Sequence, residues 1–335
     1  MIEAKPFVVA VAGPTASGKS ALAMELCRRH NGELISCDSM QIYRRMDIGT
    51  AKPSAAERSE IPHHLIDICE PTENFSAAAF ASLAAEAIHD ILRRGKLPVL
   101  CGGTGLYLDS VLGGTEFGEL RSDPSLREEL LKIADEEGPF YLHQMLEESD
   151  PEAARAIHPN NVKRVIRALE ICRLSGMTKT EWDLAARREC PYTSFLIALD
   201  YRNRDTLYER INRRVDAMIA AGLCEEVRAL LAEGALAPGT TAAGAIGYKE
   251  LINYIKGTVS LAEASEAVKT ATRRYAKRQL TWLRRNPDVF WLYPDDYPSE
   301  DLLFAQADIA VSQRILSKSE NQKWNKEPSS PTKKS

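Results

Sequence analysis

The feature that most constrains the fold is a glycine-rich segment between an apolar run at 7–12 and a helical pattern at 20–27. It fits the pattern G-x-x-x-x-G-K-[ST], in which backbone N–H groups and the N-terminus of the following helix hold a phosphate. Lys19 adds a positive charge, and the Ser20 hydroxyl can coordinate Mg²⁺. The candidate phosphate-binding residues are Gly13, Pro14, Thr15, Ala16, Ser17, Gly18, Lys19 and Ser20. The sequence therefore predicts a buried strand, a phosphate-binding turn and a helix.

Strand-like and helical patterns alternate in the first part of the chain, which favours a doubly wound parallel sheet of the α/β class. Further strands are expected at 33–37, 97–101, 194–199 and 289–292, and helices at 76–94, 205–221 and 261–285. By contrast, residues 124–186 show helical patterns alone. We therefore predict a P-loop core formed by 1–119 and 194–316, with an all-helical insertion at 120–193.

Composition narrows the class of protein. No apolar run approaches the ~20 residues needed to cross a bilayer, and the N-terminus lacks the layout of a signal peptide. The seven cysteines are scattered and form no C-x-x-C pair, which argues against a disulfide framework or a zinc site. We therefore expect a cytoplasmic protein with reduced cysteines and no membrane partner. Nothing in the sequence suggests an obligate dimer, and we expect a monomer. The polar, Lys-, Ser- and Pro-rich stretch 317–335 is predicted to be disordered.

The net charge of −4 conceals an asymmetry along the chain. Residues 1–150 carry 14 Lys and Arg against 24 Asp and Glu, a net of −10, whereas residues 151–290 carry 23 against 16, a net of +7. A basic region beside an acidic one hints at a bound polyanion. On charge alone, solvated Arg-rich helices explain the pattern equally well.

Two further segments follow predicted strands, at the sheet edge where ligands bind in doubly wound folds. Asp38 follows the second strand, where a carboxylate can accept a proton or hold Mg²⁺ through water; a helix cap or a turn is the alternative. Thr104 lies in the turn Gly102-Gly103-Thr104-Gly105 after the next strand. These glycines allow a ligand to approach the backbone closely, but they also suit an ordinary tight turn.

Together, these segments resemble the tRNA dimethylallyltransferases, also called tRNA isopentenyltransferases. The matching stretches occur in the family's order within about residues 8–293: GPTASGKS (13–20), DSMQIYRRMDIGTAKP (38–53), HHLID (63–67), GGTGLYLDSVL (102–112), RVIRALEI (164–171), GAIGYKE (244–250) and AKRQLTWLRR (276–285). The resemblance implies a P-loop core with a helical insertion.

The resemblance also implies an activity: transfer of a dimethylallyl group from dimethylallyl diphosphate to N6 of the adenosine 3′ to a tRNA anticodon, assisted by Mg²⁺. It implies that Asp38 is the general base, that Thr104 lies near the transfer site, and that the P-loop holds the diphosphate. Residues implied to contact tRNA near the reacting base are Asp38, Ser39, Met40 and Gln41.

Basic residues complete the expected substrate contacts. An arginine that binds the diphosphate is implied near 205–218; we favour Arg214, then Arg210, over Arg213. For tRNA, the implied contacts are Arg127, Lys163, Arg164, Arg167, Lys277, Arg278 and Arg284. For any single one of these residues, a solvated basic face is the alternative. We expect His63 and His64 to have a structural role, because no matching Cys or His ligands accompany them.

Three other functions fit parts of this sequence. A kinase or NTPase would bind ATP in the same P-loop and move its γ-phosphoryl group. An adenylate isopentenyltransferase would prenylate a free nucleotide, but it would need neither the insertion nor the basic segment 272–285. A non-catalytic RNA-binding module would not require Asp38 and the glycine-rich turn beside the P-loop.

Overall fold

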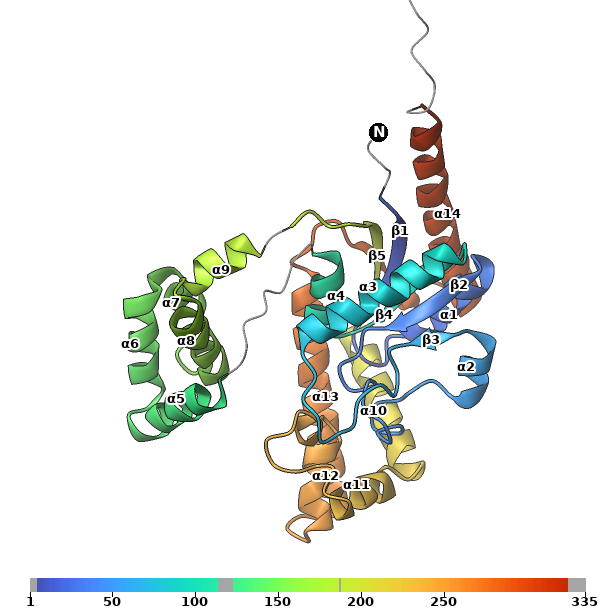
Figure 1. Cartoon of the computed structure of the whole chain (residues 1–335). Helices are drawn as coiled ribbons and strands as arrows, with labels where there is room; N and C mark the ends of the chain where they lie inside the picture. The colour runs from blue at the N-terminus through green and yellow to red at the C-terminus, as the bar shows by residue number, and fades with distance from the viewer. Residues whose placement is uncertain (1–4, 114–122, 187, 325–335) are drawn as a thin grey trace, which may run out of the picture. The chain divides into compact units, whose positions relative to one another are not determined.

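The structure is a computed structural model that describes residues 5–113, 123–186 and 188–324, with side chains described up to Ser317. The chain forms two compact units, one from residues 1–113 and 190–335 and the other from residues 114–189. The first unit contains the β-sheet, and the second consists of helices in its described part (Figure 1).

The first unit is built on a six-stranded parallel sheet with the strand order β3-β2-β4-β1-β5-β6. The strands are β1 (Phe7–Ala12), β2 (Gly32–Ser36), β3 (His63–His64), β4 (Leu97–Gly102), β5 (Thr193–Leu199) and β6 (Phe290–Leu292). In the register, Val9 of β1 pairs with Val99 of β4 and with Phe195 of β5. The chain therefore places strands on both sides of β1. Its carboxyl end is a topological switch point, where ligands bind in open α/β sheets.

Helices cover both faces of this sheet. One face packs against α1 (Lys19–Arg29) and α14 (Glu300–Trp324). The other packs against α3 (Ala77–Arg93) and α4 (Gly105–Leu112), where the rings of Phe80 and Tyr107 stack with centroids 3.9 Å apart. Because both faces are covered, the central strands read as continuous apolar runs.

A helical layer follows β5 in the first unit. It comprises α10 (Arg204–Ala220), α11 (Leu223–Ala232), η1 (Ala242–Gly244), α12 (Tyr248–Ile255) and α13 (Leu261–Leu283), with η2 (Pro294–Asp296) after β6. The hydrophobic cluster between these helices includes Ile42, Tyr43 and Met46 from the segment after β2. That segment is thereby fixed to the helical layer, although it contains no long regular element of its own. The short helix α2 (Ala55–Glu60) follows it.

The second unit packs its helices around one small core. Its helices are α5 (Pro124–Glu136), α6 (Pro139–Ser149), α7 (Pro151–Ala156), α8 (Val162–Ser175) and α9 (Lys179–Ala185). Leu130, Leu142, Leu146, Val165 and Leu169 are buried together. Proline opens α5, α6 and α7, where its missing N–H carries no cost.

The predicted α/β class is confirmed, and each predicted strand overlaps an observed one. The sequence pattern does not reveal β3, whose two residues are too few to show an alternation. The prediction of a disordered tail from 317 was wrong for its first part, since α14 continues to Trp324. Residues 317–324 contain no Pro or Gly to end a helix. The rest of that prediction, residues 325–335, lies outside the described residues. Within the described ranges, no helix has both the length and the apolar character needed to span a bilayer.

Candidate active site

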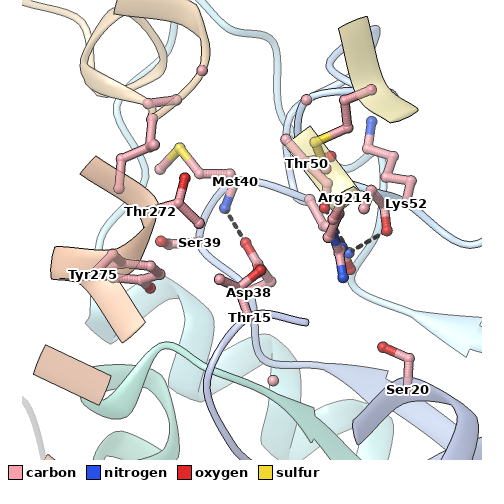
Figure 2. Close-up of a pocket in the computed structure, with 18 of the residues that line it drawn as sticks. Thr15, Ser20, Asp38, Ser39, Met40, Thr50, Lys52, Arg214, Thr272 and Tyr275 are labelled. Carbon is pink, nitrogen blue, oxygen red and sulfur yellow. Dashed lines mark hydrogen bonds between the residues drawn. The ribbon is translucent and has the colours of Figure 1, made fainter. Parts of the chain in front are cut away.

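A cavity of about 640 Å³ opens at the carboxyl end of β1, entirely within the first unit. Its walls include the P-loop and the segment 38–53, together with residues of α10, of 244–249 and of α13. Figure 2 shows Asp38 near the middle of this cavity, with Thr272 and Tyr275 on one side and Arg214 on the other. The structure therefore brings the P-loop and Asp38, which the sequence placed after different strands, into one site.

The P-loop has the backbone shape that an anion cradle needs. Ala16 and Gly18 both have positive φ, 64° and 94°, and α1 begins directly after Gly18. Lys19 Nζ donates to Pro14 O at 3.3 Å, and burial lowers the pKa of Lys19 below its ordinary value. Ser17 Oγ is buried and has no hydrogen-bond partner among the described residues. The loop thus presents a desolvated ammonium group and an unsatisfied hydroxyl, which suits a bound phosphate.

The three candidate arginines of α10 have different positions. Arg214 lines the main cavity; its burial lowers its pKa, and the charge of Asp38 opposes that shift. Arg210 instead donates through Nε to Ala16 O at 3.0 Å and supports the P-loop backbone. Arg213 is exposed and lines, with the other two, a second cavity of about 320 Å³ beside the P-loop. Arg214 alone of the three lines both cavities.

Asp38 and Thr104 are linked through the intervening backbone. Asp38 Oδ1 accepts the N–H of Met40 at 2.9 Å, and Ser39 N–H donates to Thr104 Oγ1 at 3.0 Å. Within the described residues, Asp38 Oδ2 has no hydrogen-bond partner. Gln41 has a different environment, since its amide donates to the carbonyl oxygens of Thr50 and Ala51 at 3.2 and 3.1 Å. The structure therefore leaves Asp38 available to a ligand, while Gln41 holds the wall of the cavity.

The glycines of the 102–105 turn are required by neighbouring protein atoms. A Cβ on Gly102 would lie 2.2 Å from Cys37 O, one on Gly103 2.0 Å from Gln279 Nε2, and one on Gly105 2.3 Å from the Trp282 ring. Protein atoms, rather than a ligand, thus lie close to these glycines: the backbone of Cys37 after β2, and the side chains of Gln279 and Trp282 on α13. Only Thr104 in this turn is free of that constraint.

One face of α13 forms a wall of the cavity, and the sequence did not predict this role. Val268, Thr272, Tyr275 and Gln279 recur at helical spacing and all line the cavity. Burial raises the pKa of Tyr275 to about 12, so its hydroxyl stays protonated at neutral pH. The signal was present in the sequence, but the basic residues between these positions obscured it.

The basic residues of α13 do not share one environment. Arg278 lines the cavity, with its guanidinium 5.4 Å from the Tyr275 ring centre. Lys277 is exposed and does not line it. Arg284, just past the helix, pairs with the buried carboxylate of Asp200 at 3.0 Å. These three candidate tRNA contacts therefore have different environments: Lys277 is exposed, Arg278 lines the cavity and Arg284 pairs with a carboxylate.

In the second unit, two of the four candidate tRNA contacts pair with one buried carboxylate. Arg127 makes two hydrogen bonds to Glu170, at 2.7 and 2.8 Å, and Arg167 approaches it at 3.4 Å. Glu170 itself is fully buried. Lys163 and Arg164 are exposed at the start of α8. Of these four candidates, Lys163 and Arg164 are therefore exposed, whereas a carboxylate holds Arg127 and Arg167 in place.

A carboxylate on α11, also missed from the sequence, anchors the segment 47–49. Glu226 accepts the backbone N–H groups of Asp47, Ile48 and Gly49 at 2.9, 2.8 and 3.1 Å, and the Tyr248 hydroxyl at 2.6 Å. Gly49 is needed because a Cβ there would lie 2.5 Å from the Tyr248 ring. Such long-range pairing within an irregular segment leaves no periodic signal in the sequence.

The residues in and near the cavity can be compared with the ligands that the expected Mg²⁺ would need. Among the residues that the structure describes, no group of three or more His, Cys, Asp or Glu could hold a metal ion. His64 instead pairs with Glu33 at 2.7 Å, and His63 Nδ1 lies 2.6 Å from Ile61 O. The Ser20 hydroxyl does line the cavity at the start of α1. This arrangement fits a Mg²⁺ ion whose remaining ligands come from a phosphate and water.

Comparisons with known proteins show which family the sequence resembles. The IPP transferase family model matches residues 41–286, and the isopentenyl transferase model matches residues 6–74. The tRNA dimethylallyltransferase of Bacillus licheniformis is 51% identical over 87% of this chain and 92% of that relative. That of Bacillus subtilis is 48% identical over 92% of this chain and 97% of its own.

Solved structures give the same result. The tRNA isopentenylpyrophosphate transferase of Bacillus halodurans matches with a TM-score of 0.71 and 44% identity, over 95% of this chain and 99% of its own. A eukaryotic dimethylallyltransferase described as acting on tRNA matches with a TM-score of 0.78 and 31% identity, over 93% and 80%. By sequence and by fold, this chain belongs to the tRNA dimethylallyltransferase family.

Proposed function

We propose that this protein transfers a dimethylallyl group from dimethylallyl diphosphate to N6 of adenosine 37 in tRNA, giving N6-(dimethylallyl)adenosine and diphosphate. The observation that carries the proposal is the shared cavity, in which a P-loop and Arg214 lie beside the carboxylate of Asp38. Cationic groups suit the diphosphate, and a carboxylate suits an amine that must lose a proton. The family membership of the chain supports the same reaction.

Departure of diphosphate is the step that the cationic side of the cavity would assist. The allylic C–O bond can break with carbocation character, so negative charge develops on the diphosphate. Lys19, Arg214 and the P-loop N–H groups would stabilise that charge; the burial of both cationic side chains supports this role. Mg²⁺, held by Ser20 and the diphosphate, would supply further neutralising charge.

Asp38 would act on the acceptor. The lone pair of N6 is delocalised into the purine ring, so the amine is a weak nucleophile. With Oδ1 held by the Met40 N–H, Oδ2 can accept a hydrogen bond from N6 and take its proton as the new bond forms. The adenine must leave its stack to reach this cavity, as in other enzymes that modify bases. Basic side chains of both units, including Lys163, Arg164 and Lys277, are proposed to hold the tRNA backbone.

Incubation of the full chain with labelled dimethylallyl diphosphate and Mg²⁺, with tRNA or AMP as acceptor, tests the proposal. We expect label in tRNA alone, at adenosine 37 after nuclease digestion. Label in AMP would indicate the nucleotide-prenylating alternative. Phosphoryl transfer from ATP without prenyl transfer would indicate a kinase or an NTPase, and RNA binding with neither activity would indicate a binding module.

A further inference from the structure

Gln279 joins the two halves of the candidate active site through a single buried amide. Its side chain lies on the cavity face of α13 and is 6% exposed. Oε1 accepts the backbone N–H of Thr15 at 3.0 Å, and Nε2 donates to Gly103 O at 2.9 Å. The first bond reaches the P-loop after β1, and the second reaches the turn after β4. No other side chain among the described residues has hydrogen bonds to both turns.

Each of these two contacts leads directly to reacting groups. Thr15 lies within the P-loop that would hold the diphosphate. Gly103 precedes Thr104, whose Oγ1 accepts the N–H of Ser39, the residue next to Asp38. A continuous path of hydrogen bonds and short backbone links therefore connects the phosphate side of the cavity to the carboxylate side. The absence of a side chain at Gly103 gives the Gln279 amide the space that this path needs.

We propose that Gln279 is a positioning residue that sets the separation between the P-loop and the Asp38–Thr104 side of the site. This inference rests on the proposed function and deepens it. The two contacts need one acceptor and one donor at the end of a buried side chain, and the glutamine amide supplies both at any pH. A methionine has a similar length and offers neither, and a glutamate carboxylate accepts from Thr15 but cannot donate to Gly103 O. A protonated glutamic acid can do both.

These differences give the inference a pH signature. Ionisable side chains that share the cavity with Gln279 include Lys19, Asp38, Cys101, Tyr275 and Arg278; they are the same in every variant, so the comparison with the unmodified protein accounts for their titration. In Gln279→Glu, lowering the pH protonates the introduced carboxyl and restores a donor to Gly103 O. The ratio of its kcat/KM to that of the unmodified protein should therefore rise as the pH falls. In Gln279→Met that ratio should stay flat, since the thioether does not titrate. We expect this variant to lose about 10- to 100-fold in kcat/KM for dimethylallyl diphosphate, because small errors in position are costly in transfer reactions.

The experiment uses the full chain and a matched control on the same helix. Thr281→Val removes a polar group from an exposed position of α13 outside the cavity, and it should match the unmodified protein in every measurement. Affinity for tRNA should change less than twofold in Gln279→Met. A pH-independent ratio for Gln279→Glu, or near-normal kcat/KM in Gln279→Met, would overturn the inference.

A second readout does not depend on prenyl transfer. Binding of inorganic diphosphate with Mg²⁺, measured by calorimetry, should be weaker in Gln279→Met than in Thr281→Val. If the unmodified protein fails to label tRNA but this difference is found, the proposed function fails and the positioning role stands. If the unmodified protein labels tRNA but Gln279→Met equals Thr281→Val in both diphosphate affinity and kcat/KM, the positioning role fails alone.

Discussion

Asp38 is a residue whose structural and chemical contributions can be separated. In Asp38→Asn, Oδ1 can still accept the Met40 N–H, so the turn should keep its shape. The amide cannot accept the proton of N6, and kcat should fall by ~10²–10⁴-fold, the usual contribution of a general base. The KM for dimethylallyl diphosphate should change little. Steady-state kinetics of prenyl transfer measure both quantities, and turnover near that of the unmodified protein would remove Asp38 from the mechanism.

Lys19 predicts a pH dependence of donor binding. Burial lowers its pKa from the ordinary 10.5, so the ammonium loses its proton at a lower pH than a free lysine does. The charge is present below that pKa and is lost as the pH rises through it. The KM for dimethylallyl diphosphate should therefore start to rise at a lower pH than a free lysine would predict. Lys19→Met should have a higher KM throughout and lack this rise; an identical alkaline profile in both proteins would contradict the assignment.

At the scale of elements, the irregular segment 47–49 owes its position to α11 and α12. Glu226→Gln keeps one acceptor oxygen but loses the other, so backbone N–H groups lose their partners. The free energy of unfolding should fall by about 1–3 kcal/mol, the range for losing hydrogen bonds to a charged group, since the donors of Ile48 and Gly49 are partly buried. Tyr248→Phe removes a single donor and should cost less, about 0.5–1.5 kcal/mol. Urea unfolding measures both changes, and equal losses in the two variants would argue against the shared carboxylate as the anchor.

The elements also show what the sequence could and could not predict. The central strands and the P-loop were predictable because continuous apolar runs and a fixed glycine spacing are local signals. The partners of Glu226 and Gln279 were not, since each lies far along the chain from the backbone that it holds. For the same reason, the sequence leaves the glycines at 102–105 open between a close approach by a ligand and an ordinary tight turn, whereas in the structure two of them accommodate side chains of α13.

Across the whole molecule, the distribution of charge is expected to direct tRNA and dimethylallyl diphosphate to different basic groups. The first 150 residues carry a net charge of −10, so a tRNA should concentrate on the basic residues of 151–290. Within that range, Lys277 is exposed outside the cavity, whereas Arg214 and Arg278 line it. Arg278 is therefore placed to affect both substrates, and Lys277 is the cleaner reporter of tRNA binding.

Salt dependence tests this separation. Each lost phosphate contact should reduce the slope of log K against log salt by roughly 0.7–0.9. Lys277→Ala should weaken tRNA binding and reduce this slope by the amount expected for one lost contact. It should not change the KM for dimethylallyl diphosphate. Arg214→Ala should raise that KM or lower kcat and leave the tRNA slope unchanged. Binding titrations over a range of salt, paired with donor kinetics, measure both effects. If the two variants shift both quantities alike, tRNA and diphosphate do not use separate basic groups in this protein.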